Sequence, residues 1–317
     1  MRIPTIGDVL QARQVLTAEL PPTPMWSYPA LNAATGAHVF VKHENVQPTG
    51  AFKVRGGLNL LAAMPPADQA GGVVGYSTGN HAQALAYAAE RFGVACTIVM
   101  PDNPNPIKAA AVRAYGAELI EYGANLEDAR EHAAKLAADN GARLVSAGDE
   151  PDLIAGVATA YLEIFEQAPD IAAIVVPVGS GTGAAAACLV AAAVAPDCEI
   201  IAVQSTASPA AHDSWRTGRI VRRPNRTTME GLATGSGFEL TQRILRAHLS
   251  DFLLVDDRGI AHAQRVLARD AHLLTEGAGA AATAALLAYP NRFAGTHVAV
   301  VATGANASAH EIARLAA

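Results

Sequence analysis

Residues 172–194 read AAIVVPVGSGTGAAAACLVAAAV, and this stretch decides the fold class. It opens with an apolar run of the length of a buried strand, passes through a glycine-rich turn and continues as an alanine-rich helical pattern. Gly179, Gly181 and Gly183 let the backbone curl, so that successive N–H groups converge at the positive end of the helix. The order predicts one unit of an α/β fold, in which the turn either binds a phosphate or is a tight turn without a ligand.

The same alternation of strands and helices runs along most of the chain. Strands are predicted at 38–42, 72–76, 96–100, 118–122, 172–178, 199–204 and 297–302. Helices are predicted at 81–92, 106–115, 126–140, 153–167, 183–194, 258–272 and 278–287. This order predicts a mainly parallel sheet covered by helices. Residues 205–237 interrupt it as an irregular stretch, whose length predicts an active-site loop or a subunit contact.

The composition excludes several classes of protein. With 317 residues, 51% of them hydrophobic and 16% charged, the chain can bury a large core and is not typical of a disordered protein. We find no uninterrupted apolar run that would suit a membrane span. A net charge of −6 argues against a general nucleic-acid surface, and the short basic cluster from Arg216 to Arg226 is interpreted as a solvated loop.

The cysteines and the N-terminal sequence indicate the cellular compartment of the protein. Cys96, Cys188 and Cys198 lack metal-ligand spacing and adjoin apolar segments, so we expect buried free thiols in a reducing environment. The first residues lack the apolar core and cleavage site of a secretory signal. A cytoplasmic location is therefore expected.

Three further segments carry candidate chemistry. Lys53 stands at the start of a predicted helix in an apolar setting, where its amine either acts as a nucleophile or belongs to a surface lysine. The turn from Ser77 to His81 joins a strand to a helix, and is either a cradle for a carboxylate or an ordinary cap. Thr303 follows the last strand, and is either a helix cap or a hydroxyl at the edge where open sheets bind ligands. A lysine, two anion cradles and a hydroxyl together suit pyridoxal phosphate.

The order of these segments resembles the fold type II pyridoxal-phosphate enzymes (tryptophan synthase β-like), and within them the threonine/serine dehydratase and serine racemase group. The most specific segment is Gln47-Pro-Thr-Gly-Ala-Phe-Lys53-Val-Arg-Gly. The other similar segments are Ser77-Thr-Gly-Asn-His81, Asp149-Glu-Pro-Asp-Leu-Ile-Ala-Gly156, the Gly179–Gly183 loop, Thr275-Glu-Gly-Ala-Gly279 and Thr303-Gly-Ala-Asn306.

The resemblance implies an architecture of two three-layer α/β/α domains with mainly parallel twisted sheets. Residues 1–67 and 146–317 would form a large cofactor domain, and 68–145 a small domain that closes over the substrate. A homodimer is implied as well. Because the chain ends soon after Thr303, we expect no C-terminal effector domain and a catabolic or unregulated role in amino-acid metabolism.

The resemblance also implies roles for individual residues. Lys53 would hold the cofactor aldehyde as a Schiff base, with Phe52 beside the ring. Asn80 would bind the phenolic oxygen, and Thr303 would face the pyridine nitrogen. The remaining residues fall into a substrate-carboxylate group (Ser77, Thr78, Gly79, Asn80, His81), a phosphate group (Gly179, Ser180, Gly181, Thr182, Gly183) and Glu276 near the ring.

The implied reaction is conversion of a β-hydroxy amino acid into a 2-oxo acid and ammonia. Lys53 would remove the α proton, and a neutral hydroxyl at Thr303 fits prompt loss of the β substituent. Ala51, Ala305 and the sequence after Gly156 depart from the family pattern, which leaves substrate identity open. The alternatives are a serine or aspartate racemase, with Thr78 as second acid/base beside Ser77, or a 3-hydroxyaspartate-type dehydratase.

Other classes fit less well. A dinucleotide-dependent oxidoreductase lacks G-x-G-x-x-G, and a hydrolase at Ser77 lacks G-x-S-x-G. A non-catalytic amino-acid-binding protein is the rival outside the enzymes. We predict no metal ion, because Glu230 is the one carboxylate in the stretch that resembles a family cation site.

Overall fold

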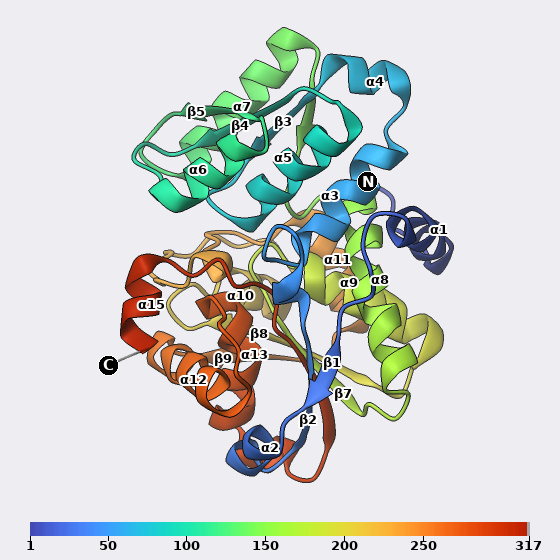
Figure 1. The fold of residues 1–317 in the computed structure, drawn as a ribbon, viewed down its shortest axis with the longest axis vertical. Coiled ribbons are helices and arrows are strands. Elements are labelled where there is room, and N and C mark those ends of the chain that lie inside the picture. Colours follow the sequence, from blue (N-terminus) through green and yellow to red (C-terminus); the bar gives the residue numbers. More distant parts are fainter. Residues whose placement is uncertain (316–317) are drawn as a thin grey trace.

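The computed structural model describes residues 1–315 and contains two sheets covered by helices (Figure 1). The strands are β1 (Met25–Ser27), β2 (His38–Lys42), β3 (Val73–Tyr76), β4 (Cys96–Met100), β5 (Glu118–Glu121), β6 (Arg143–Val145), β7 (Ala173–Pro177), β8 (Glu199–Ser205), β9 (Asp251–Val255) and β10 (His297–Val301). The helices are α1 (Ile6–Thr17), α2 (Pro29–Thr35), η1 (Glu44–Val46), α3 (Lys53–Ala63), α4 (Pro66–Gly71), α5 (Asn80–Phe92), α6 (Pro106–Ala114), α7 (Leu126–Asn140), α8 (Pro151–Gln167), α9 (Thr182–Val194), α10 (Ala210–Thr217), η2 (Glu230–Leu232), α11 (Glu239–His248), α12 (Asp257–Asp270), α13 (Gly277–Ala288), α14 (Pro290–Phe293) and α15 (Ala309–Leu315).

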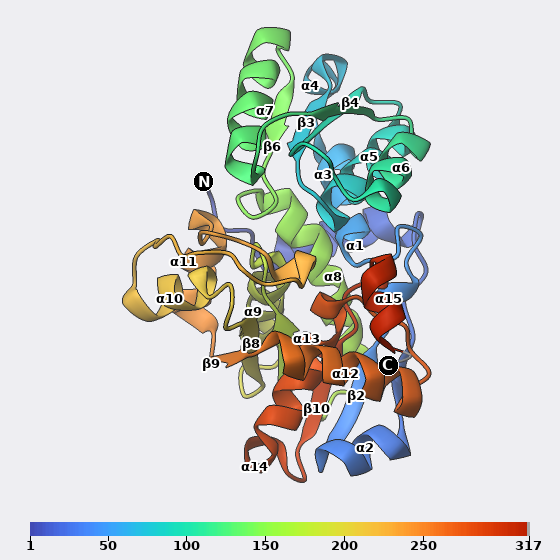
Figure 2. The same ribbon diagram turned by 90° about the vertical axis from the view of Figure 1, so that its left-hand side faces the viewer.

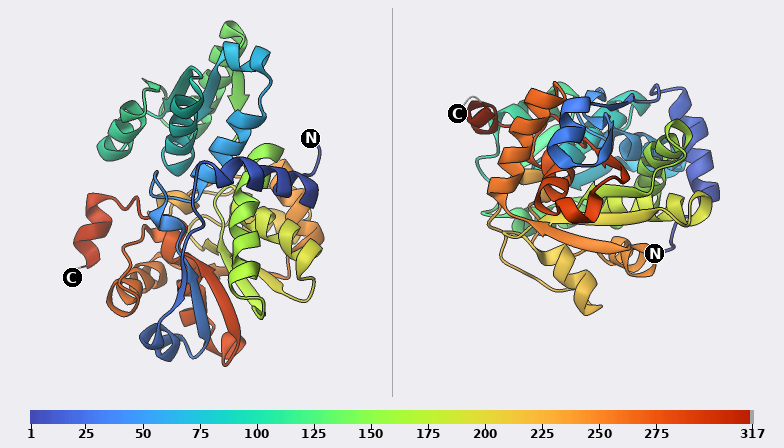
Figure 3. Two further views of the ribbon diagram at one scale, coloured as in Figure 1. Left: turned by 45° about the vertical axis from the view of Figure 1, so that its right-hand side comes forward. Right: turned by 90° about the horizontal axis from the view of Figure 1, so that it is seen from below.

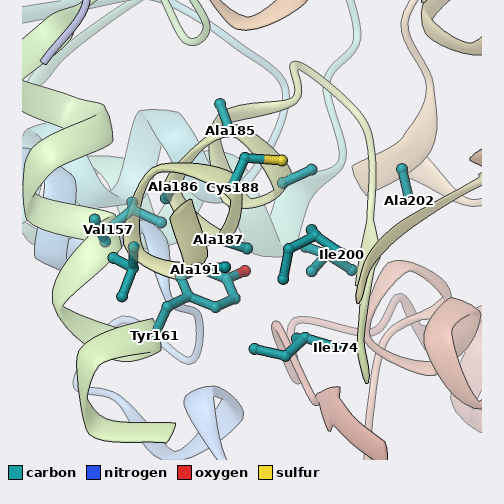
Figure 4. Packing of buried hydrophobic residues seen from close by; sticks show 14 of the residues in the cluster. Val157, Tyr161, Ile174, Ala185, Ala186, Ala187, Cys188, Ala191, Ile200 and Ala202 are labelled. Atoms are coloured by element: carbon teal, nitrogen blue, oxygen red, sulfur yellow. The ribbon is translucent and has the colours of Figure 1, made fainter. Parts of the chain in front are cut away.

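The larger sheet has the strand order β1-β2-β10-β7-β8-β9 and is parallel except for the β1–β2 pair. Alternate residues of its central strands face opposite layers, as the period of a strand requires. Ile174 and Val176 pack with α8, α9 and α11, while Ala173 and Val175 pack with α2, α12 and α13. Figure 4 shows the side of the sheet covered by α8 and α9, where Tyr161 lies among alanines of α9. Small side chains there allow the helix to approach the sheet closely.

The smaller sheet has the order β5-β4-β3-β6 and is parallel throughout. Helix α5 packs on one face, and α7 covers the other through Ala129, Ala133 and Ala137. Both sheets are therefore three-layered, as predicted. The smaller sheet lies above the larger one in Figure 1, and α1 and α15 lie on opposite sides of the molecule in Figure 3.

Helices α3 and α8 connect the two sheets and pack against each other (Figure 2). Glycines permit this crossing: a Cβ on Gly156 would lie 2.4 Å from the Arg55 carbonyl oxygen, and a Cβ on Gly56 would lie 2.9 Å from that of Leu153. No real Cβ atom approaches backbone that closely, so larger residues would separate the helices. The division of the chain at residues 68 and 145 stays a prediction, although all strands of the smaller sheet fall between them.

The sequence predictions of the strands and helices are largely confirmed, with shifts of one or two residues at their ends. Asn125 caps α7 by accepting from two backbone N–H groups, and Gly141 ends it in the left-handed conformation. The prediction of an irregular stretch over 205–237 was wrong in part, because it contains α10 and η2. Glu230 and Thr234 of the same stretch line the pocket described below, as predicted for an active-site loop. Arg216 belongs to α10 and not to a loop, although its side chain is exposed.

Two further sequence predictions concern the cysteine side chains and membrane-spanning helices. Cys96, Cys188 and Cys198 are buried free thiols, and burial raises the pKa of each to about 12. Within residues 1–315, no helix has the length and apolarity needed to cross a bilayer.

Candidate active site

Lys53 is the first residue of α3 and projects its amine toward the glycine turn of the larger sheet. The chain leaves β2 through η1 and turns at Gly50, whose φ of +68° favours glycine. The Lys53 Nζ donates to Ser180 Oγ at 3.1 Å and to Thr182 Oγ1 at 3.3 Å. Burial lowers the pKa of the Lys53 amine to about 8, so an appreciable fraction is neutral near physiological pH. A neutral amine can attack a carbonyl carbon.

The turn at residues 179–183 joins β7 to α9 and exposes a row of backbone donors. Gly181 precedes the helix with φ +89°, which only glycine adopts without strain. In the described chain, the N–H groups of residues 179–184 have no protein acceptor. The hydroxyls of Ser180 and Thr182 lie 3.0 Å apart beside them. Converging N–H groups at a helix N-terminus, with two hydroxyls and an amine nearby, are a donor set that fits a phosphate.

The turn at residues 77–81 joins β3 to α5 and faces the Lys53 amine from the smaller sheet. The Gly79 N–H donates to Ser77 Oγ at 3.2 Å, and Asn80 begins α5. His81 is buried, and burial followed by the charge of Lys53 lowers its pKa to about 3, so its ring is neutral. A second helix N-terminus therefore points at the pocket, as an anion site requires.

Thr303 and Glu276 close a third side of the pocket. The backbone at Thr303 is hydrogen-bonded to the residue before Lys53: the Phe52 N–H donates to the Thr303 carbonyl oxygen at 3.0 Å. Glu276 is buried and accepts a hydrogen bond from Asn80 Nδ2. Burial raises the pKa of the Glu276 carboxyl. A Cβ on Gly304 would lie 2.4 Å from Glu276 Oε1, so glycine there leaves room for the pair.

One pocket between the two sheets contains every site residue predicted from the sequence. Its lining includes Phe52, Lys53, Ser77, Thr78, Gly79, Asn80, His81, Gly179, Ser180, Gly181, Thr182, Gly183, Glu276 and Thr303. An amine, a phosphate cradle, an amide and a hydroxyl thus converge from four separate loops. The set fits a phosphorylated aromatic aldehyde, which would meet the amine at its carbonyl carbon and the glycine turn at its phosphate.

The pocket also contains residues that the sequence predictions missed. Lys108 of α6 is 4% exposed, and its Nζ lies 2.5 Å from Glu230 Oε2 of η2. Tyr76, Thr234 and Phe238 line the pocket as well. Tyr76 ends a predicted strand, but no local pattern marks Lys108 as a pocket residue. Within residues 1–315, no three His, Cys, Asp or Glu side chains are grouped as a metal site would require.

A buried ionic cluster lies behind the lysine-bearing helix. Arg55 pairs with Glu44 at 2.8 Å and with Glu163 at 2.6 Å, and Lys42 also pairs with Glu163 at 2.6 Å. Burial alone would raise the pKa of the Glu44 carboxyl, but Arg55 holds it below its usual value. The cluster ties α3 to β2 and α8, and so fixes the backbone that carries Lys53.

Comparisons with known proteins agree with this geometry. The sequence model of the family described as "Pyridoxal-phosphate dependent enzyme" matches residues 16–304. The chain is 33% identical over 316 residues to an L-threo-3-hydroxyaspartate ammonia-lyase of Saccharomyces cerevisiae, covering 99% of this chain and 97% of the relative. It is 34% identical to an L-threonine ammonia-lyase of Thermotoga maritima, covering 98% and 78%. Maize serine racemase has a similar structure, with TM-score 0.92, 28% identity and coverage of 99% and 97%.

Proposed function

Because the chain belongs to the pyridoxal-phosphate-dependent enzyme family, we propose that it is an ammonia-lyase that converts β-hydroxy amino acids of the threonine and serine type into 2-oxo acids and ammonia. The observation that carries the proposal is the position of Lys53, whose amine lies within hydrogen-bonding distance of two hydroxyls of the glycine turn. The same pocket has a second helix N-terminus that suits an amino-acid carboxylate.

The residues of the pocket fit pyridoxal 5'-phosphate, the cofactor of the family. The glycine turn would bind the phosphate, Lys53 the aldehyde carbon, and Thr303 the ring nitrogen. When bound, the cofactor supplies a carbonyl group that condenses with the substrate amine and a ring that withdraws electrons from Cα. The side chains of the protein position the substrate and transfer its protons.

Lys53 is the residue that moves protons in the proposed reaction. With a pKa of about 8, its amine accepts the substrate α proton at near-neutral pH. Ser77, Thr78 and Gly79 would hold the substrate carboxylate and so orient Cα toward this amine. The β-carbon then loses its hydroxyl as water. Hydrolysis of the C–N bond takes up a water, so the net products are a 2-oxo acid and ammonia.

A 3-hydroxyaspartate substrate is the second candidate, and one observation favours it. The ammonium of Lys108 is buried in the pocket, where it could meet a second substrate carboxylate. The yeast relative carries the name of that activity. Racemisation is a third candidate, because the Thr78 hydroxyl lines the same pocket as Lys53.

The test is oxo-acid release from a panel of L-, D- and threo/erythro β-hydroxy amino acids, with chiral analysis of the unreacted substrate. We expect L-threonine and L-serine to be turned over, and Lys53→Ala to abolish turnover together with the visible absorbance of the bound cofactor. The matched control is Lys135→Ala, which removes an exposed lysine of α7 and should keep both. Turnover by Lys53→Ala, or oxo-acid release from none of the panel by the wild type, would refute the proposal.

A further inference from the structure

Asn306 forms a link between two loops of the site. It lies three residues beyond Thr303, and its Nδ2 donates to Asn80 Oδ1 at 2.8 Å and to the Thr49 carbonyl oxygen at 2.9 Å. Asn80 belongs to the smaller-sheet side of the pocket, and Thr49 lies before Lys53 in the segment that leads into α3. One side-chain amide thus joins the segment before Lys53 to the first residue of α5.

The direction of every hydrogen bond in this link follows from one backbone group. The Thr49 carbonyl oxygen can only accept, so the group that faces it is the NH2 of Asn306. The second hydrogen of that NH2 then points at Asn80, which must present its oxygen. The NH2 of Asn80 is therefore on the other side, where one hydrogen goes to Glu276. These hydrogen bonds together determine which side-chain atom of Asn306 and of Asn80 is the nitrogen and which is the oxygen. The positions of the heavy atoms alone do not distinguish the two.

The surrounding backbone is shaped to hold Asn306 in place. Gly50 has no Cβ, and a Cβ there would lie 2.7 Å from Asn306 Oδ1. The Ala305 N–H donates to the Gly50 carbonyl oxygen at 2.9 Å, and Ala51 pairs with Gly304 as an isolated antiparallel bridge. These two contacts hold the segments in register next to the Asn306 side chain. An ordinary surface asparagine has no such constraints.

We propose that Asn306 is a positioning residue, which fixes the Asn80 amide so that it presents an N–H group, and not its oxygen, to the cofactor ring. Asn80 has two N–H groups, of which Glu276 takes one, and Asn80 lines the pocket. The phenolic oxygen of the cofactor is an acceptor. An Asn80 amide turned by 180° would place its own oxygen against that acceptor and against the Glu276 carboxyl, which is repulsive. The inference rests on cofactor binding and not on the amino acid turned over.

The test is Asn306→Asp, which keeps the shape of the side chain and removes both N–H donors. Two carboxylate oxygens would then face Thr49 and Asn80, and Asn80 would turn its NH2 toward the new carboxylate and its oxygen toward the cofactor. We expect the Kd of pyridoxal phosphate to rise about tenfold or more, the effect of one misdirected hydrogen bond. The visible circular-dichroism band of the bound cofactor, which reports ring orientation, should change as well.

Two companion variants make the result specific. Asn59→Asp is the matched control: Asn59 Nδ2 of α3 also donates to a backbone carbonyl, that of Asp152 at 2.8 Å, but does not line the pocket. It should lower stability and leave the cofactor Kd and the circular-dichroism band unchanged. Asn306→Ala removes one of the two groups that orient Asn80 and leaves the hydrogen bond to Glu276, so we expect a smaller rise in Kd. This variant is used if Asn306→Asp does not fold.

The proposal is overturned if Asn306→Asp binds the cofactor with wild-type Kd and circular dichroism, or if Asn59→Asp weakens the cofactor equally. It is also overturned if Asn80→Ala has no effect on the cofactor Kd. Absence of ammonia-lyase turnover in the wild type would refute the proposed function and leave these binding measurements interpretable. The two failures are therefore distinguishable.

Discussion

Lys108 and Glu230 form an ion pair between the two sheets, with 2.5 Å between Nζ and Oε2. Lys108 lies on α6, beside the smaller sheet, and Glu230 on η2, which packs against α13 of the larger one. Both residues line the pocket. The two partners differ in burial, because the lysine side chain is 5% exposed and the glutamate 37%. The ammonium therefore depends on its partner more than the carboxylate does.

This difference predicts unequal effects of removing either partner. Glu230→Gln removes the hydrogen-bonded counter-charge of a buried ammonium, so we expect the free energy of unfolding to fall by about 2 kcal/mol. Lys108→Met leaves a carboxylate that can turn into water, so the loss should stay within about 1 kcal/mol. Urea denaturation of both variants and of the double variant measures the difference. Equal losses of unfolding free energy in the two single variants would contradict the assumption that the more buried partner depends more on the ion pair.

The lowered pKa of Lys53 predicts how cofactor loading depends on pH. The neutral amine is the reactive form, so the rate at which the apoprotein gains visible absorbance with added pyridoxal phosphate should rise about tenfold per pH unit below 8 and level off above about 9. Stopped-flow absorbance measures this rate. A rate that keeps rising to about pH 10 would indicate an ordinary lysine pKa and contradict the assigned burial effect.

Gly181 and Gly218 provide a matched test of the glycine turn. Both have positive φ, +89° and +71°, so alanine at either position brings backbone strain of about 1 kcal/mol. A Cβ on Gly218 would meet nothing within 4 Å, whereas one on Gly181 would lie 3.0 Å from Thr241 Oγ1. We expect Gly181→Ala to raise the cofactor Kd at least tenfold and Gly218→Ala to leave it unchanged. Fluorescence titration measures both, and equal Kd values would exclude the turn as the phosphate site.

His43 predicts acid sensitivity of the fold. Burial, and then the charge of Lys42, lowers the pKa of His43 from 6.5 to about 4. The unfolded chain therefore takes up a proton before the folded one does, and stability falls as the pH falls from about 6.5 to about 4, then levels off for this group. We expect His43→Gln to remove roughly 1–3 kcal/mol of that fall. The exposed His248→Gln should keep the wild-type slope in urea denaturation across this range; a wild-type slope in His43→Gln would reject the assignment.

The sequence predicts those elements whose own residues are sufficient to define them. The run at Ala172–Val178 has the length and β-branched content of a buried strand, and the structure has β7 there. The strands at Met25–Ser27 and Arg143–Val145 are too short to carry a pattern, and they form because neighbouring strands pair with them. The helix at Glu239–His248 was missed although Leu240 and Ile244 give it an apolar stripe.

The residues of the site also fall into those that the sequence predicts and those that it does not. Residues of the four loops follow or precede strands and helices, so parallel topology brings them to one edge of each sheet. The partnership of Lys108 with Glu230 joins residues 122 positions apart, and nothing near either residue indicates the other. The link from Asn306 to Asn80 likewise depends on how the two sheets lie together. Such contacts between sheets have no local signal.

The helix that begins at Lys53 shares part of its buried face with the smaller sheet. Leu58 and Leu61 of α3 are buried in one cluster with Val73 of β3 and Ile98 of β4. A fluctuation that opens this cluster therefore loosens the helix that carries the reactive amine. Amide hydrogen exchange should show α3, β3 and β4 opening as a single cooperative unit, with one common opening free energy. The placement of Lys53 then depends on the smaller sheet as well as on the ionic cluster behind α3, although the lysine lies in neither sheet.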